Sequence, residues 1–117
     1  MTKTLEDFKT YEPVFPEAET CKTENLIGQT IRIKAAHRRK GEKGDFYVLL
    51  CSDEKGKLVS FATGGLALVK WIKAFLDGSK LLDAEDKTNF FPEEIEVIML
   101  QKKSKSSGLK YFDFANS

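Results

Sequence analysis

Few residues in this chain of 117 are of the types that do acid–base, nucleophilic or metal chemistry. It has one histidine, His37, and two cysteines, Cys21 and Cys51, which are far apart and form no C-x-x-C motif. A zinc site and a histidine-based catalytic triad both need more ligands or partners than these. We therefore expect no metal site, no catalytic residue, no cofactor and no enzymatic activity.

Two other patterns are weaker candidates for chemistry. Glu93, Glu94 and Glu96 lie close together, but no cation or metal ligand accompanies them, so we expect a solvated edge there. Gly64-Gly65 precede an apolar stretch, as glycines do in phosphate-binding loops. No lysine-serine pair follows them, and a bend between a strand and a helix is enough to explain both glycines.

The basic residues are concentrated in two windows of the sequence, residues 32–43 and residues 102–110. These windows hold ten of the 19 Lys and Arg residues and one of the 18 Asp and Glu residues, although the whole chain has a formal net charge of only +1. The remaining nine bases and seventeen acids predict a surface of opposite sign elsewhere. Such segregation predicts a site for a polyanion if the fold brings the windows together. The ten residues are Arg32, Lys34, Arg38, Arg39, Lys40, Lys43, Lys102, Lys103, Lys105 and Lys110.

Composition predicts one small globular domain. Apolar residues make up 41% of the chain and charged residues 32%, which is too apolar for disorder. No apolar run approaches the roughly 20 residues of a spanning helix, so we expect no membrane partner. The start, MTKTLEDFKTYEP, has no basic region followed by an apolar stretch. We therefore expect no secretory signal, a cytoplasmic location and reduced thiols.

Residues 1–25 form a distinct acidic segment. It carries two prolines, Pro13 and Pro16, which argue against a long helix. We expect either an arm that packs a few aromatic side chains on the domain or on a second copy, or a frayed terminus. Its acids are Glu6, Asp7, Glu12, Glu17, Glu19 and Glu24.

Residues 26–117 carry the periodicity of five strands and one helix. Alternating or continuous apolar residues, separated by glycine-containing turns, predict the strands. A stripe of Leu68, Ile72, Phe75 and Leu76 predicts a helix that follows Gly64-Gly65. Basic loops are expected at 37–44 and 102–108. The expected strands are Thr30–Ala36, Phe46–Ser52, Lys57–Thr63, Ile95–Gln101 and Leu109–Ala115.

This order of elements predicts an all-β domain with one helix, namely a five-stranded Greek-key OB-fold barrel with its helix between strands three and four. An SH3-like barrel or another β-roll is the alternative. In an OB-fold, ligands lie across strands two and three, between the loop joining strands one and two and the loop joining strands four and five. Those loops are the two basic windows, so topology and charge select the same surface.

Two short motifs add a resemblance. The sequences SFATGG (Ser60 to Gly65) and SKSSGLKYFDF (Ser104 to Phe114) resemble those of OB-type single-stranded DNA-binding proteins from phages and mobile elements. The resemblance covers roughly residues 25–114 and implies sequence-tolerant binding and protection of single strands in replication or recombination, in the bacterial host cytoplasm if a phage encodes the protein. Such proteins usually carry an acidic tail tip that recruits partners. Here the last strand is followed by FANS, so we do not expect tail-mediated recruitment.

Single-strand binding needs cations along the phosphates and flat side chains under the bases. The ten basic residues supply the cations. For stacking we favour Tyr47, Phe61 and Tyr111, which lie on strands that border the expected groove. The two tyrosines are preferred to their phenylalanine neighbours because a side chain with a polar tip suits a half-exposed surface. We assign Trp71 to a barrel plug or an oligomer contact. Packing roles are expected for Phe75, Phe90, Phe91 and Phe114.

The predicted function is therefore sequence-nonspecific binding of single-stranded DNA through a basic, aromatic groove. One alternative is an OB-like adaptor whose basic face meets an acidic partner, such as a replication or recombination protein. RNA binding is another, because stacking and phosphate contacts do not sense the 2′-hydroxyl. One OB domain contacts few nucleotides, so we also expect a homodimer or a larger homo-oligomer.

Overall fold

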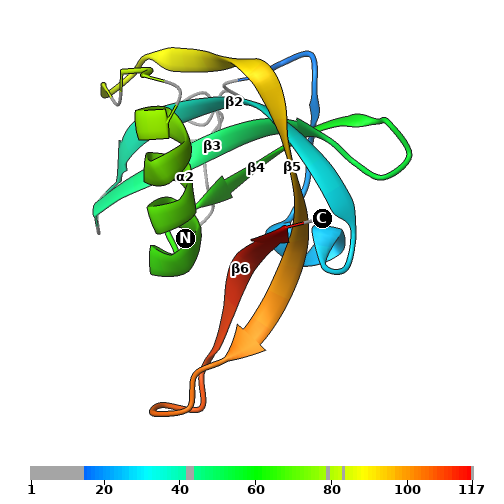
Figure 1. The fold of residues 1–117 in the computed structure, drawn as a ribbon, viewed down its shortest axis with the longest axis vertical. Helices are drawn as coiled ribbons and strands as arrows, with labels where there is room; N and C mark the ends of the chain where they lie inside the picture. The colour runs from blue at the N-terminus through cyan, green and yellow to red at the C-terminus, as the bar shows by residue number, and fades with distance from the viewer. Residues whose placement is uncertain (1–14, 42–43, 79, 83, 117) are drawn as a thin grey trace, which may run out of the picture.

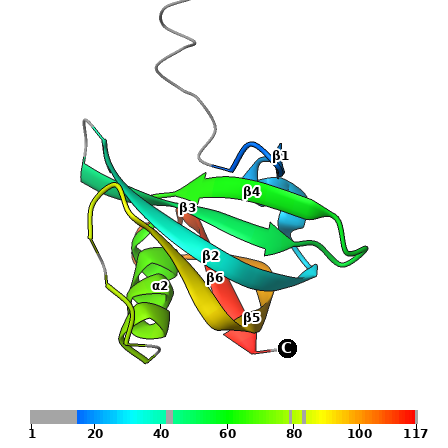
Figure 2. The same cartoon turned by 90° about the horizontal axis from the view of Figure 1, so that it is seen from above.

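A six-stranded sheet and one α-helix make up the fold (Figures 1 and 2). The computed structural model describes residues 15–41, 44–78, 80–82 and 84–116. A short 3-10 helix, η1, connects the first two strands. In chain order the elements are β1 (Glu19–Thr20), η1 (Thr23–Leu26), β2 (Thr30–Gly41), β3 (Gly44–Ser52), β4 (Leu58–Thr63), α2 (Leu66–Gly78), β5 (Thr88–Lys103) and β6 (Lys110–Asn116).

The strands follow one another in the sheet in the order β1-β4-β3-β2-β5-β6. All neighbours are antiparallel except β1, which pairs with β4 in parallel through Glu19–Val59 and Thr20–Ser60. The prediction of a β-rich domain with one α-helix is confirmed. The sheet nevertheless has six strands rather than five, and it is open, because the described pairs do not join its edge strands, β1 and β6, and do not join β4 to β6.

Side chains rather than hydrogen bonds fill this open side. Leu68, Ile72 and Leu76 form the buried stripe of α2 and join the main apolar core. Next to this stripe the Phe75 ring stacks on Phe114 of β6, with ring centroids 6.3 Å apart. Leu26 of η1 is also buried in the same core. Helix α2 is therefore held against β6, and this contact positions the groove described below.

A β-bulge divides strand β2 into two parts. The register shifts between Ile33 and Ala35 against both neighbouring strands: Lys34 is the extra residue against β3, whereas against β5 the extra residues belong to β5, between Phe90 and Ile95. After the bulge, Ala36 faces the main core whereas Ala35 joins a second apolar cluster with Phe15, Ala18 and Leu50. The two clusters lie on opposite faces of the sheet, because consecutive residues of a strand point to opposite sides.

Two predicted boundaries are wrong. The basic segment expected to be a loop at 37–44 is mostly strand, since Arg38, Arg39 and Lys40 pair with β3. Likewise, β5 begins at Thr88, seven residues before the strand expected at Ile95–Gln101. Polar and charged residues hide such strands from periodicity, but backbone pairing with a neighbour tolerates them when their long side chains reach solvent.

The described part of the acidic segment, residues 15–25, packs on the sheet. Phe15 is buried between its sheet neighbours in the second cluster, and Cys21 donates its backbone N–H to Ser60. Residues 1–14 lie outside the described part of the chain. Residue 26, the predicted start of the domain, is thus preceded by residues that share a buried apolar cluster with β2 and β3.

Replacing Phe15 by alanine tests whether residues 15–21 belong to the folded domain. We expect Phe15→Ala to lower the free energy of unfolding by about 3 kcal/mol, because a buried aromatic ring is lost. Phe90→Ala is the matched control, with an expected loss below about 1 kcal/mol, since Phe90 is 63% exposed. Urea denaturation measures both. Equal effects would mean that residues 15–21 do not belong to the domain.

Candidate nucleic-acid interface

A groove of about 430 Å³ lies between helix α2 and strand β6. Its helix side presents two alanines together with a lysine and a tryptophan, and its strand side presents a tyrosine and an aspartate. The mixture of flat rings, small side chains and a cation suits a flat, anionic ligand. The lining residues are Ala67, Lys70, Trp71, Ala74, Tyr111 and Asp113.

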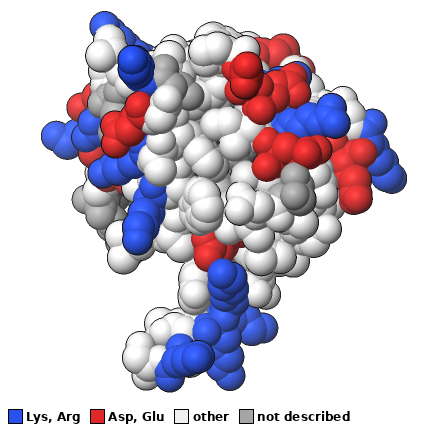
Figure 3. Space-filling model, in the orientation of Figure 1, with Lys and Arg blue, Asp and Glu red and all other residues white. Residues whose placement is uncertain are grey.

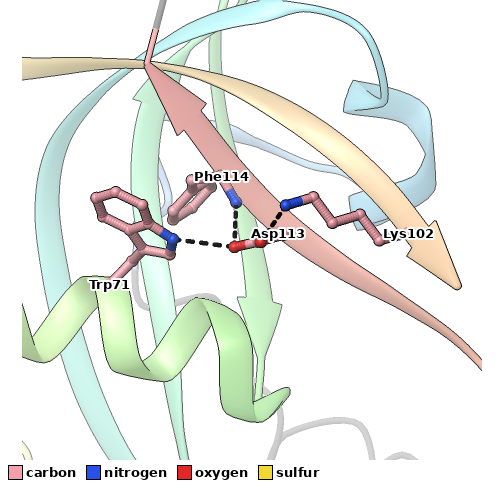
Figure 4. Close-up of polar contacts among 4 residues, drawn as sticks. All are labelled: Trp71, Lys102, Asp113 and Phe114. Carbon is pink, nitrogen blue, oxygen red and sulfur yellow. Dashed lines mark hydrogen bonds and ion pairs between the residues drawn. The ribbon is translucent and has the colours of Figure 1, made fainter. Parts of the chain in front are cut away.

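The Asp113 carboxylate organises one wall of this groove (Figure 4). Its Oδ1 accepts hydrogen bonds from the Trp71 indole Nε1–H and from the Phe114 backbone N–H, each 2.9 Å long. Its Oδ2 accepts a bond of 2.9 Å from the Lys102 ammonium of β5. Three elements, α2, β5 and β6, are thus tied together at a single carboxylate.

The charges of this group reinforce one another. Partial burial opposes ionisation of Asp113, but the hydrogen bonds from Lys102, the Phe114 N–H and Trp71 outweigh it and hold its pKa below the ordinary value. The hydrogen bond to Asp113 in turn raises the pKa of Lys102. Both groups are therefore charged at neutral pH, and Trp71 keeps a fixed orientation.

Lysines lie on both sides of the groove. Lys70 comes from the helix, while Lys102, Lys103, Lys105 and Lys110 belong to the β5–β6 hairpin. Figure 3 shows Lys and Arg side chains covering this projecting hairpin, with mostly uncharged surface above it. Within the described ranges, Lys102 is the one lysine of these five that has a carboxylate within ion-pair distance. The other four are available to phosphates.

No described residue of the first basic window lines this groove. Arg38 donates hydrogen bonds to Asp45, which lowers the pKa of the Asp45 carboxyl; nearby Lys40 and Lys73 lower it further. The β2–β3 hairpin therefore lies close to Lys73 of α2. Arg39 pairs in register with Phe46, and its side chain points to the opposite face of the strand pair from that of Arg38. Lys43 lies outside the described residues. Helix α2 packs against β6 of the second basic hairpin (Figure 1), and its Lys73 acts electrostatically on Asp45 of the first.

Arg32 and Lys34 lie outside this groove, and each has a carboxylate of β5 as its partner. The Arg32 guanidinium is 3.5 Å from Glu96, and Lys34 donates to Glu94, which lowers the pKa of the Glu94 carboxyl. Arg32 and Glu96 border a separate cavity beside the β3–β4 turn. Carboxylates of β5 thus balance the cations of β2, a cross-strand arrangement that strand order alone does not reveal.

Two of the three predicted stacking residues are in the core. Tyr47 is 2% exposed and Phe61 is 1% exposed, so neither presents a ring surface to a base. The prediction failed because the parity of the strand, rather than the polar tip of tyrosine, decides the side: Tyr47 shares the inner face of β3 with Leu49 and Cys51. Tyr111 is 40% exposed, as the predicted role requires.

Several residues of the groove escaped the prediction. Lys70, Trp71 and Asp113 were not proposed as binding residues, although Ala67, Trp71 and Ala74 recur at helical spacing beside the core stripe. That pattern of small residues around a tryptophan is the signal that was available. Phe90 was assigned to packing but lies mostly exposed on β5.

The thiols and the histidine have no comparable setting. Burial raises the pKa of the Cys51 thiol to about 12, and burial and nearby Glu19 raise that of Cys21. Both thiols are therefore protonated and poorly nucleophilic at neutral pH. His37 bonds Thr88 through Nδ1, at 2.7 Å, and burial together with Arg39 lowers its pKa.

Comparisons with protein-family models, with curated proteins and with solved structures gave no match to the chain. Among the residues whose structure is described, no three His, Cys, Asp or Glu side chains are grouped so that they could hold a metal ion. Within the same ranges, the helices are too short or too polar to cross a membrane.

The ionised state of Asp113 gives a pH test of the groove. Its folded-state pKa lies below the ordinary value of 3.8, so its contribution to stability is present above that value and is lost as the pH falls through the folded pKa. We expect Asp113→Asn to be less stable than the natural protein at about pH 7, and this difference to shrink at about pH 3. Urea unfolding at both pH values measures it. A difference independent of pH would contradict the assigned network.

Proposed function

We propose that the protein binds single-stranded DNA without sequence preference along the groove between α2 and β6. The observation that carries this proposal is the exposed Tyr111 ring, set between Lys70 on the helix and the lysine-rich β5–β6 hairpin. An unpaired base presents a π-face of any sequence to such a ring, while the lysines neutralise the phosphates on either side. Trp71 forms the neighbouring wall, oriented by Asp113.

The strand pairing supports an OB-fold of the partly open kind. The strands β2 to β6 stand for its five strands, with α2 between the third and the fourth. The bulged β2 pairs with both β3 and β5, so one strand serves both halves of the sheet. In that fold the loops between strands one and two and between strands four and five grip the ligand. Here these are the β2–β3 and β5–β6 hairpins.

One departure moves the site within that fold. Phe15 and Ala18 cover Leu50 of β3 and Ala35 of β2, on the outer face of the sheet where an OB-fold ligand would lie. We therefore place the single-stranded DNA in the groove between α2 and β6 rather than on that outer face of the sheet. An acidic protein partner, or RNA in place of DNA, would use the same lysines, and the binding assay below distinguishes these ligands.

Salt dependence tests the phosphate contacts. We expect the affinity for fluorescent oligo(dT), measured by anisotropy, to fall with salt at a log–log slope of about −3, for four to five phosphates neutralised. Lys70→Glu should make the slope shallower by about 0.7 or more. Lys55→Glu, in the β3–β4 turn, is the charge-matched control and should leave the slope unchanged.

An affinity that does not change with salt would contradict the proposal. Stronger binding to RNA of the same length would mean that RNA, rather than DNA, is the ligand. Binding to an acidic protein together with no binding to either nucleic acid would favour the adaptor function.

Removal of the Tyr111 ring tests the stacking. We expect Tyr111→Ala to weaken oligo(dT) binding by about 1–3 kcal/mol, the range found for base–aromatic stacking. Because the ring is 40% exposed, the midpoint of thermal unfolding should hardly change. Tyr47→Ala, which removes a core ring, is the contrasting variant and should lower that midpoint strongly. Undiminished binding by Tyr111→Ala would exclude the ring as a base contact.

A further inference from the structure

The β5–β6 ribbon, residues 101–111, projects from the body of the protein (Figures 1 and 3). It continues the β5–β6 ladder through the pairs Lys102–Tyr111 and Lys103–Lys110. Its residues are exposed except for Ser104, which is half-buried. A projecting two-stranded ribbon of this kind has the width that the major groove of a duplex admits.

The tip of this ribbon is held in one conformation. The Ser104 N–H donates to the Leu109 carbonyl, and the Gly108 N–H donates to the Ser104 carbonyl. Gly108 has a φ of 71°, a left-handed conformation that glycine adopts without strain. The Ser107 hydroxyl accepts a further bond, of 3.3 Å, from the Leu109 N–H. The turn therefore fixes the position of Leu109 before any ligand binds.

Leu109 is exposed in a setting that is otherwise cationic. Its side chain is 71% exposed, and Lys103, Lys105 and Lys110 surround it in sequence. Leu109 lies in the turn directly before β6, two residues from Tyr111, which lines the groove. A single strand that is seated on Tyr111 and continues into a duplex toward the tip would bring the duplex, rather than the strand in the groove, beside Leu109.

A leucine cannot serve as a stacking surface in the way that an aromatic ring does. Apolar side chains of this shape act on nucleic acids as wedges, which enter between bases and unstack them. Lysines close to such a wedge can neutralise the phosphates of the duplex that it enters. The tip therefore suits the point where paired strands separate.

We propose that the β5–β6 ribbon binds the junction between a single strand and a duplex, with Leu109 against the terminal base pair and its neighbouring lysines on the duplex phosphates. This inference rests on the proposed function, because the single strand next to the junction occupies the α2–β6 groove. The ligand is a tailed duplex, and the effect is to open its last base pair.

The test compares the affinities of two DNA probes for the 117-residue protein. One is an oligo(dT), and the other is the same oligo(dT) joined to a hairpin duplex with 2-aminopurine in its terminal base pair. We expect the tailed duplex to bind about tenfold more tightly and its 2-aminopurine fluorescence to rise. Leu109→Ser should abolish both effects while leaving oligo(dT) affinity unchanged.

Leu82→Ser is the matched control, since Leu82 is 68% exposed but lies far from β6 in the sequence, in the segment between α2 and β5. It should retain the junction preference. Equal affinity for both probes, or an equal loss with Leu82→Ser, would overturn the inference and leave the proposed function intact. Failure of the natural protein to bind oligo(dT) at all would instead overturn the proposed function.

Discussion

The packing of helix α2 into the open side of the sheet is the constraint on which the rest of the structure depends. The described strand pairs do not join β4 to β6, so Leu68, Ile72 and Leu76 bury the core there instead. Burial of apolar surface is non-directional, so the helix closes the sheet without matching its hydrogen bonds. It also leaves a groove along its outer flank, because Ala67 and Ala74 are too small to fill the space beside β6.

Electrostatics divides the surface into two kinds of basic residue. On the β2–β5 side, Arg32 and Lys34 face Glu96 and Glu94, and these exposed pairs contribute little to stability but cancel much of the local charge. On the ribbon, a run of lysines is broken by serines and glycine, with no acid until Asp113. The near-zero net charge of the chain therefore conceals one neutralised face and one cationic projection.

The groove and the ribbon are parts of one continuous surface. Asp113 anchors Trp71 and Lys102 at the inner end, Tyr111 follows on the same strand, and Leu109 lies at the tip. The β5–β6 ladder and the hydrogen-bonded turn keep this surface stiff. The protein would therefore lose little conformational entropy when a ligand binds to it. A single strand and the duplex beside it would thus meet surfaces of different chemistry on one preformed element.

The sequence alone determined the β-rich class, the amphipathic helix after Gly64-Gly65 and the segregation of charge, because periodicity and composition are local properties. It also placed Tyr111 on an exposed face. It did not determine which cations are neutralised, since the partners of Arg32 and Lys34 are more than fifty residues away in the chain. Nor did it place Tyr47, whose side of the sheet follows from register and the core behind it. The tertiary structure decided these points because strand pairing and helix packing bring together residues distant in sequence.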